Sequence, residues 1–327
     1  MNLSDLTALL SELSQVDAPS GHEGPLRAWL QAHLPPHTTA RTDGLGNLIV
    51  TPADASSVEV LVVAPLDEVG FLAQPGPAPG WMRLAPLGPA PTPGPASARV
   101  RFAGGARGVL TRDPAAGQAQ GWDAWLCDVG EEPVPVGQAA VWDTEPVVQT
   151  GRVLGKAVGV RAALLAAYLT LHTAQPRRPT AWVFAARERV PGRGSAPAAL
   201  GLDPTYALRV VPAPAGDEPG RRIPGLRLAA GPGLRRHEWG RAADARLVGW
   251  LTRLARDARL AFQDEVPRER EPSWASLPLV AAGVSTVTLS IPTRNLYAAH
   301  QAVAVSDVLA AARWLQAALE AQGDPLA

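Results

Sequence analysis

The chain has 327 residues, of which 46% are hydrophobic, and is therefore long enough to bury a large core. Its single cysteine excludes an internal disulfide and a cysteine-rich zinc site. Thirty basic residues balance thirty acidic residues, which argues against nucleic acid as a partner. The N-terminus lacks a signal-peptide pattern, and no apolar run reaches the roughly 20 residues of a membrane span. We therefore expect a cytoplasmic protein that binds neither nucleic acid nor a membrane.

The first part of the chain combines helix and strand signals. Leucines at helical spacing predict an amphipathic helix over residues 3–14. Ser20 followed three residues later by Glu23 has the spacing of a capping box and predicts the start of a second helix. Residues 48–50 follow a turn-rich stretch and are expected to form a strand beside the strand of residues 58–64.

The run over residues 58–64 is the strongest strand signal in the sequence. It is almost continuously apolar and is followed at once by two carboxylates, Asp67 and Glu68. A short run of this kind predicts a strand buried on both faces, and α/β folds place their sites at the carboxyl ends of such strands. We therefore expect a functional site around these carboxylates.

Residues 74–150 have a different texture. Proline and glycine crowd the beginning, and short alternating runs separated by turn residues follow. This pattern predicts a small all-β module rather than a long elaborated loop, because structureless loops of this length are rare in compact domains. The runs expected to form strands are 98–102, 107–111, 124–127 and 138–142.

After Gly151 the alternation of helices and strands returns. Ser306 is expected to cap the last helix of the chain. The sequence thus predicts a discontinuous α/β domain made of residues 1–73 and 151–327, interrupted by a β-rich insert at 74–150. The remaining expected elements are helices over 162–173 and 247–258 and strands over 181–186, 206–211 and 284–291.

Seven short motifs follow one another along the chain. They are Ala18-Pro-Ser-Gly-His-Glu23, Asp43-Gly-Leu-Gly-Asn47, Leu66-Asp-Glu-Val-Gly-Phe71, Gly155-Lys156, Val190 to Ser195, Ala230-Gly-Pro232 and Ser290-Ile-Pro-Thr-Arg294. Taken together and in this order, they resemble the dinuclear-metal aminopeptidases of the tetrahedral, glutamyl and deblocking aminopeptidase family. The resemblance implies an aminopeptidase-like α/β fold with an inserted small β-barrel-like domain, and a cytoplasmic exopeptidase with two zinc or cobalt ions. It also implies assembly into dimers and dodecamers through the insert.

The resemblance also assigns five positions to the metal ligands of the family, which are histidines and carboxylates. Apart from tyrosine, which is a poor ligand, the residues at these positions in this chain offer no group that coordinates zinc or cobalt. An arginine at such a position opposes a cation, because its guanidinium stays protonated. We therefore expect no metal and no other cofactor. The five residues are Pro65, Gly159, Arg189, Val211 and Tyr297.

Two acidic residues of the family pattern are retained. The resemblance places Glu188 at the general base and Asp67 at the aspartate beside the metals. Two buried carboxylates without a cation would repel each other. We therefore expect the side chain of Arg189 to occupy the place of a metal and to pair with Asp67 or Glu188, and we expect Tyr297 and Trp274 to fill the rest of the pocket.

These observations favour a catalytically inactive homologue with a binding, assembly or regulatory role. The alternative is an active metal-dependent aminopeptidase, or another hydrolase, with an altered or mononuclear site built from Asp67, Glu188 and His300. The insert carries several tryptophans in a weakly charged stretch, which favours burial against a partner and predicts a homo-oligomer, a dimer or larger. An active paralogue and a peptide ligand are further candidate partners. The tryptophans are Trp81, Trp122, Trp125 and Trp142.

Overall fold

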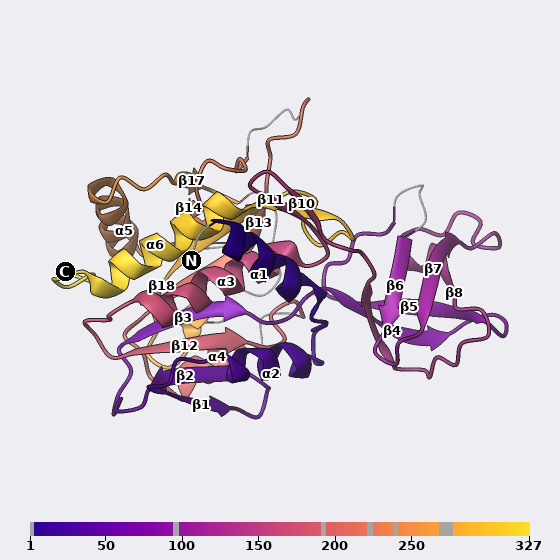
Figure 1. Cartoon of the computed structure of the whole chain (residues 1–327), viewed down its shortest axis with the longest axis horizontal. Helices are drawn as coiled ribbons and strands as arrows, with labels where there is room; N and C mark the ends of the chain where they lie inside the picture. The colour runs from indigo at the N-terminus through magenta and orange to yellow at the C-terminus, as the bar shows by residue number, and fades with distance from the viewer. Residues whose placement is uncertain (1–2, 94–97, 191–193, 221–224, 239–240, 268–276) are drawn as a thin grey trace.

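The structure is a computed structural model that describes residues 3–93, 98–190, 194–220, 225–238, 241–267 and 277–327. Its larger part is an α/β body, and a small β-barrel lies beside this body (Figure 1). This arrangement confirms the predicted α/β fold with an inserted β-barrel-like domain. Among the described helices, none is long and apolar enough to cross a membrane.

The α/β body is built on one eight-stranded sheet, in the order β1-β2-β12-β3-β13-β18-β14-β17. Its four middle strands, β12, β3, β13 and β18, are parallel, so their carboxyl ends meet at one edge of the sheet. The strands span Thr38–Thr42 (β1), Leu48–Pro52 (β2), Val60–Pro65 (β3), Thr180–Ala185 (β12), Tyr206–Pro214 (β13), Gly233–Arg235 (β14), Gln263–Glu265 (β17) and Ser285–Thr293 (β18).

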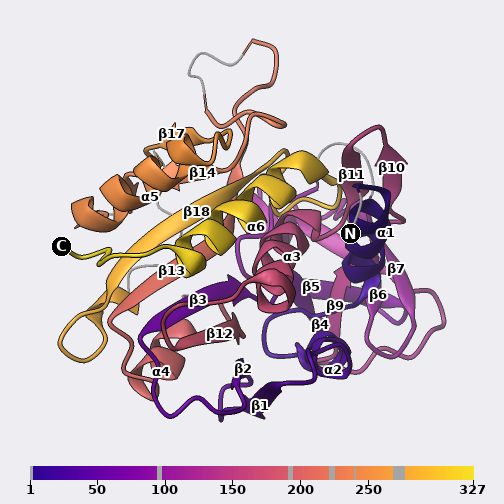
Figure 2. The same cartoon turned by 60° about the vertical axis from the view of Figure 1, so that its left-hand side comes forward.

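Helices cover both faces of this sheet, which is why β3 and β12 are apolar at almost every position. On one face lie α3 (Val158–Thr173) and α6 (Val305–Glu320), which run side by side across the middle strands (Figure 2). α4 (Ser195–Leu200) and the short helix η2 (Leu277–Leu279) pack on the opposite face. The expected cap residue Ser306 lies inside the first turn of α6, and Ala304 is at the cap position with no side-chain bond.

The expected pairing of the strand at 48–50 with the strand at 58–64 is wrong. β12 lies between them, parallel to β3 and antiparallel to β2. The physical reason is burial, since every residue of β12 is buried and needs neighbours on both sides, whereas β2 and β1 form a hairpin towards the edge.

Two more helices, α1 (Leu3–Gln15) and α2 (Gly24–Ala32), precede the sheet. The capping box expected at the start of α2 is not formed, because Glu23 is at the cap position without a side-chain cap bond. Its carboxylate instead accepts hydrogen bonds from the backbone N–H groups of Gly21 and Arg187, and the hydroxyl of Ser20 donates to Asp67. Tertiary partners near the site thus replace the local cap.

The insert forms a closed six-stranded barrel, in the order β4-β5-β8-β7-β6-β9. Phe71 and Trp142 are buried in its core and Trp122 packs against them, with ring centroids 4.8 Å apart for Phe71 and each tryptophan. The division of the chain at residues 74 and 150 stays a prediction. The barrel strands span Gly70–Pro75 (β4), Trp81–Leu87 (β5), Ala98–Phe102 (β6), Arg107–Arg112 (β7), Trp125–Asp128 (β8) and Ala139–Trp142 (β9).

The barrel is joined to the α/β body by charge pairs and by a second sheet. Arg101 of β6 donates to both carboxylate oxygens of Asp17, at 2.7 and 3.0 Å, and to Asp143 at 3.1 Å. The second sheet has three strands, β10 (Val147–Gln149), β11 (Arg152–Gly155) and β19 (Gln301–Ala304). The exit of the barrel is therefore held against the end of the α/β body that carries the candidate site.

Candidate functional site

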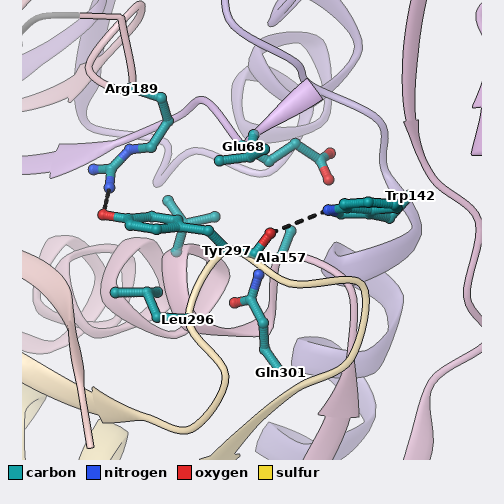
Figure 3. Close-up of a pocket in the computed structure, with 9 residues that line it drawn as sticks. Glu68, Trp142, Ala157, Arg189, Leu296, Tyr297 and Gln301 are labelled. Carbon is teal, nitrogen blue, oxygen red and sulfur yellow. Dashed lines mark hydrogen bonds between the residues drawn. The ribbon is translucent and has the colours of Figure 1, made fainter. Parts of the chain in front are cut away.

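The candidate site lies at the carboxyl ends of β3 and β12, where the loops after these strands meet the loop between β18 and β19. Arg189 follows β12, and Tyr297 comes from the loop between β18 and β19. Both line one pocket with Trp142 of the barrel and Gln301 of β19 (Figure 3). Trp274, which was expected to fill part of this pocket, lies outside the described residues.

Asp67 is completely buried directly after β3. Its carboxylate accepts hydrogen bonds from the Ser20 hydroxyl and from the backbone N–H groups of Glu188 at 2.9 Å and Arg189 at 2.6 Å. Burial raises its pKa to about 6, while the charge of Arg189 and the bond from Ser20 act in the opposite direction. Asp67 therefore fastens the loop after β12 to the end of β3.

The contact between Arg189 and Asp67 differs from the expected one. We predicted a pair made by the guanidinium, but the hydrogen bond to Asp67 described above comes from the main chain of Arg189. The guanidinium donates from Nη1 to the phenol oxygen of Tyr297 at 2.8 Å. Its central carbon lies 5.6 Å from the centre of the Tyr297 ring, within the range of a cation–π contact.

Glu188 is buried beside Arg189, with 1% of its surface exposed. Its Oε1 accepts a hydrogen bond from the backbone N–H of Ser195 at 2.8 Å. Ser195 is the first residue of α4, so the carboxylate satisfies one of the N–H groups at the start of this helix. Glu188, which the resemblance places at the general base, thus makes a hydrogen bond that stabilises the start of α4.

Gly159 lies in the first turn of α3, where the space for a side chain is already taken. A Cβ at this position would lie 2.7 Å from Cγ2 and 2.8 Å from Oγ1 of Thr293. Pro65 ends β3, and Val211 is buried in β13 opposite Ser290 of β18. At these three positions the described structure holds apolar groups or no side chain.

Glu68, which the sequence analysis singled out together with Asp67, lines the pocket and belongs to a second charged cluster, whose cations the sequence analysis missed. Glu68 is 2% exposed and accepts hydrogen bonds from Nζ of Lys156, at 2.9 Å for both oxygens, and from Nη2 of Arg161 at 2.9 Å. Lys156 also contacts Asp17 at 3.0 Å. The available signal was that Lys156 is the only lysine of the chain and follows a glycine in a family motif.

The donor atoms around the pocket do not fit a pair of metal ions. Within the described ranges there is no group of three or more His, Cys, Asp or Glu side chains placed to hold a metal ion. Asp67 and Glu188 are occupied by N–H and hydroxyl donors, and the guanidinium of Arg189 lies on the pocket wall. His300 of the alternative site is exposed, whereas Asp67 and Glu188 are buried.

The sheet order, the barrel insert and the site at the strand ends define an aminopeptidase-like α/β protein. The chain belongs to the M42 glutamyl aminopeptidase family, whose model matches residues 46–314. This match covers most of the α/β body and the whole barrel.

Solved structures agree with this assignment. Aminopeptidase APDkam598 from the archaeon Desulfurococcus kamchatkensis has a TM-score of 0.89 at 23% identity, over 99% of this chain and 96% of that chain. The TET aminopeptidase of Thaumarchaeota archaeon SCGC AB-539-E09 has a TM-score of 0.85 at 21% identity, over 97% of both chains. The Pyrococcus horikoshii TET1 peptidase, described as assembling into a tetrahedron or a large octahedral shell, has a TM-score of 0.81 at 18% identity, over 97% of this chain and 99% of that chain. At these identities the structures establish the fold alone.

Proposed function

We propose that this chain is a catalytically inactive member of the aminopeptidase family, with a binding, assembly or regulatory role. The supporting observation is the set of residues at the five positions that the resemblance assigns to metal ligands. Pro65, Gly159 and Val211 offer no donor side chain, while Arg189 and Tyr297 are bonded to each other across the pocket. Hydrolysis by a metal pair needs histidine or carboxylate ligands at such positions.

A peptidase assay tests this proposal. The purified protein is incubated with zinc, cobalt or manganese and a panel of aminoacyl chromogenic substrates, with the Asp67→Ala variant as the control. We expect the same background rate for both proteins with every metal. Metal-dependent turnover of about 1–10³ s⁻¹ by the wild type, absent in the variant, would overturn the proposal.

The second function to be tested is hydrolysis at an altered site that holds a single metal. Elemental analysis of the untreated protein separates it from the first proposal. Stoichiometric transition metal that disappears both in Asp67→Ala and in His300→Ala would support it. Metal content that is low, or equal in the wild type and these variants, would count against it.

We also propose that the chain assembles with itself. The support is the barrel, together with the assembly described for the TET1 peptidase, which has the same fold. Light scattering at micromolar concentration should show a dimer or a larger particle, and a monomer would contradict the proposal. Association with an active paralogue or a peptide, and a cytoplasmic location, stay predictions.

A further inference from the structure

Tyr297 holds an unusual backbone conformation. Its φ angle is +71°, in the left-handed region that large side chains rarely adopt, and Asn295 two residues earlier has a φ of +50°. A strained residue persists only where its surroundings hold it in place, and such residues are common at functional sites. The contacts of this loop show what holds it.

The barrel fixes the loop through its last strand and the residues that follow. Nε1 of Trp142 donates to the carbonyl oxygen of Tyr297 at 3.1 Å, and the hydroxyl of Thr144 donates to the carbonyl oxygen of Ala299 at 3.1 Å. Figure 3 shows Arg189 and Trp142 reaching Tyr297 from opposite ends. The position of the ring therefore depends on a contact that crosses from the barrel to the α/β body.

The phenol ring of Tyr297 forms part of the pocket lining (Figure 3). Val69, Val160 and Leu296 provide apolar walls, and Arg189 supplies the donor for the phenol oxygen. The cavity beside the ring has a volume of about 10 Å³, which is room for about one water molecule. Tyr297 thus lines the pocket with a half-buried ring, and its phenol oxygen is bonded to Arg189.

We propose that Tyr297 is a built-in occupant of this pocket, that Trp142 of the barrel holds it there, and that the pocket takes a phenolic ring from outside when the loop moves away. The proposal rests on the proposed non-catalytic function and names the ligand class of the same site. An external ligand would be a para-substituted phenol, such as a tyrosyl side chain. Its ring would contact Val69 and Val160, which are outside the moving loop, and its oxygen would accept the hydrogen bond from Arg189.

The first test is complementation of a cavity. Tyr297→Gly removes the ring and suits the left-handed backbone, so the variant should stay folded. Calorimetric titration with p-cresol should give a Kd at least tenfold lower for this variant than for the wild type. Toluene, which lacks the hydroxyl, should bind the variant at least tenfold more weakly than p-cresol does. Adding Arg189→Met should remove this preference for p-cresol.

The second test examines whether the hydrogen bond from Trp142 keeps Tyr297 in place. It removes the N–H group of Trp142 and leaves the other pocket residues unchanged. Trp142→Phe retains an aromatic ring but loses the N–H group, so the loop should open more readily and the affinity for p-cresol should rise at least threefold. Trp122→Phe is the matched control. Trp122 is partly buried and packs against the same core, but its Nε1 donates to Ala90, which is not in this loop. This variant should bind as the wild type does.

Three results would overturn the proposal. These are a folded Tyr297→Gly variant that binds p-cresol no better than the wild type, equal binding of p-cresol and toluene by that variant, and equal effects of Trp142→Phe and Trp122→Phe. The titrations use neither metal nor peptide substrate. A failure here is therefore distinct from metal-dependent turnover in the peptidase assay, which would refute the proposed function.

Discussion

Two adjacent carboxylates at the end of β3 are stabilised in opposite ways. Glu68 is bound by the cations Lys156 and Arg161, whereas Asp67 accepts hydrogen bonds from the Ser20 hydroxyl and from two backbone N–H groups. Both are almost completely buried. On the Glu68 side the negative charge is balanced by side chains of the chain itself. On the Asp67 side the donors are mainly neutral, and the nearby positive charge is that of Arg189.

This difference shows two ways in which the chain's own groups hold a buried carboxylate at the strand ends. The Glu68 cluster ties α3, the end of β3 and the segment after α1 together through charge pairs and one backbone hydrogen bond. On the Asp67 side the donors are two backbone N–H groups and the Ser20 hydroxyl, and the guanidinium of Arg189 is bonded to Tyr297. The two sides should therefore respond differently to mutation and to pH.

The largest expected effect is on the Glu68 side. Glu68→Ala leaves Lys156 and Arg161 buried without this carboxylate, which should lower the free energy of unfolding by about 3–5 kcal/mol. Guanidinium denaturation measures the loss. Adding Lys156→Met to the variant should recover part of it, because one buried cation is removed. A loss below about 1 kcal/mol would mean that the cluster does not stabilise the fold.

A smaller loss is expected when the charge of Arg189 is reversed. Arg189→Glu places three carboxylates together with Asp67 and Glu188, and should cost on the order of 3 kcal/mol at pH 8. The loss should shrink at pH 5, since carboxyl groups that take up a proton no longer repel. Peptidase activity should not appear. Arg189→Met, the control, should stay within about 1 kcal/mol of the wild type. Equal losses for both variants at both pH values would contradict this account.

The crowding at Gly159 predicts a cost from a single methyl group. Gly159→Ala should destabilise the protein by about 1–3 kcal/mol, because Thr293 and the start of α3 must move apart. Gly249→Ala in α5 (Ala245–Asp257) is the matched control. The nearest atom to its added Cβ is the end of the Arg253 side chain at 3.7 Å, and alanine is the better helix former, so stability should rise by about 0.5–1 kcal/mol. A Gly159→Ala variant as stable as the wild type would show that the position has room for a side chain.

The last expected effect is the pH dependence of the Asp67 side, which develops gradually over about two pH units. The pKa of Asp67 is about 6 in the folded protein, above its ordinary value of 3.8, so the folded state binds the proton more tightly. The contribution of this group to stability is therefore fully present below about pH 4 and is lost as the pH rises towards 6, by up to about 1.4 kcal/mol per pH unit.

The comparison with Asp67→Asn isolates this contribution. Urea denaturation of the wild type and the variant at several pH values between 4 and 7 should show that the advantage of the wild type shrinks as the pH rises to about 6. An advantage that grows with pH would mean that the folded pKa lies below 3.8, and that the hydrogen bonds to Asp67 outweigh its burial.

Much of the fold was visible in the sequence because burial leaves a periodic signal. The apolar run at 58–64 and the short runs of the insert predicted β3 and four of the barrel strands. β5 (Trp81–Leu87) was missed because it lies in a stretch rich in proline and glycine. The position of β12 between β2 and β3 was missed because the sequence of an apolar strand does not indicate which strands pair with it.

The contacts of the site were less predictable for a related reason. Residue types predicted that Asp67, Glu188 and Arg189 meet, but not which atoms pair. Backbone N–H groups carry no sequence signal, so the main-chain donors to Asp67 could not be anticipated. The hydrogen bond from Trp142 to Tyr297 joins residues that are 155 positions apart, so no local sequence pattern predicts it. The left-handed backbone of Tyr297 was likewise not predicted.

The most direct test of the central claim, that these residues cannot hold a metal pair, is a calorimetric titration with zinc. The protein is first treated with a chelator, and the wild type is compared with Asp67→Ala. The account predicts no stoichiometric binding at this site, and therefore the same weak heats for both proteins. Two equivalents of zinc bound by the wild type and lost in Asp67→Ala would contradict it.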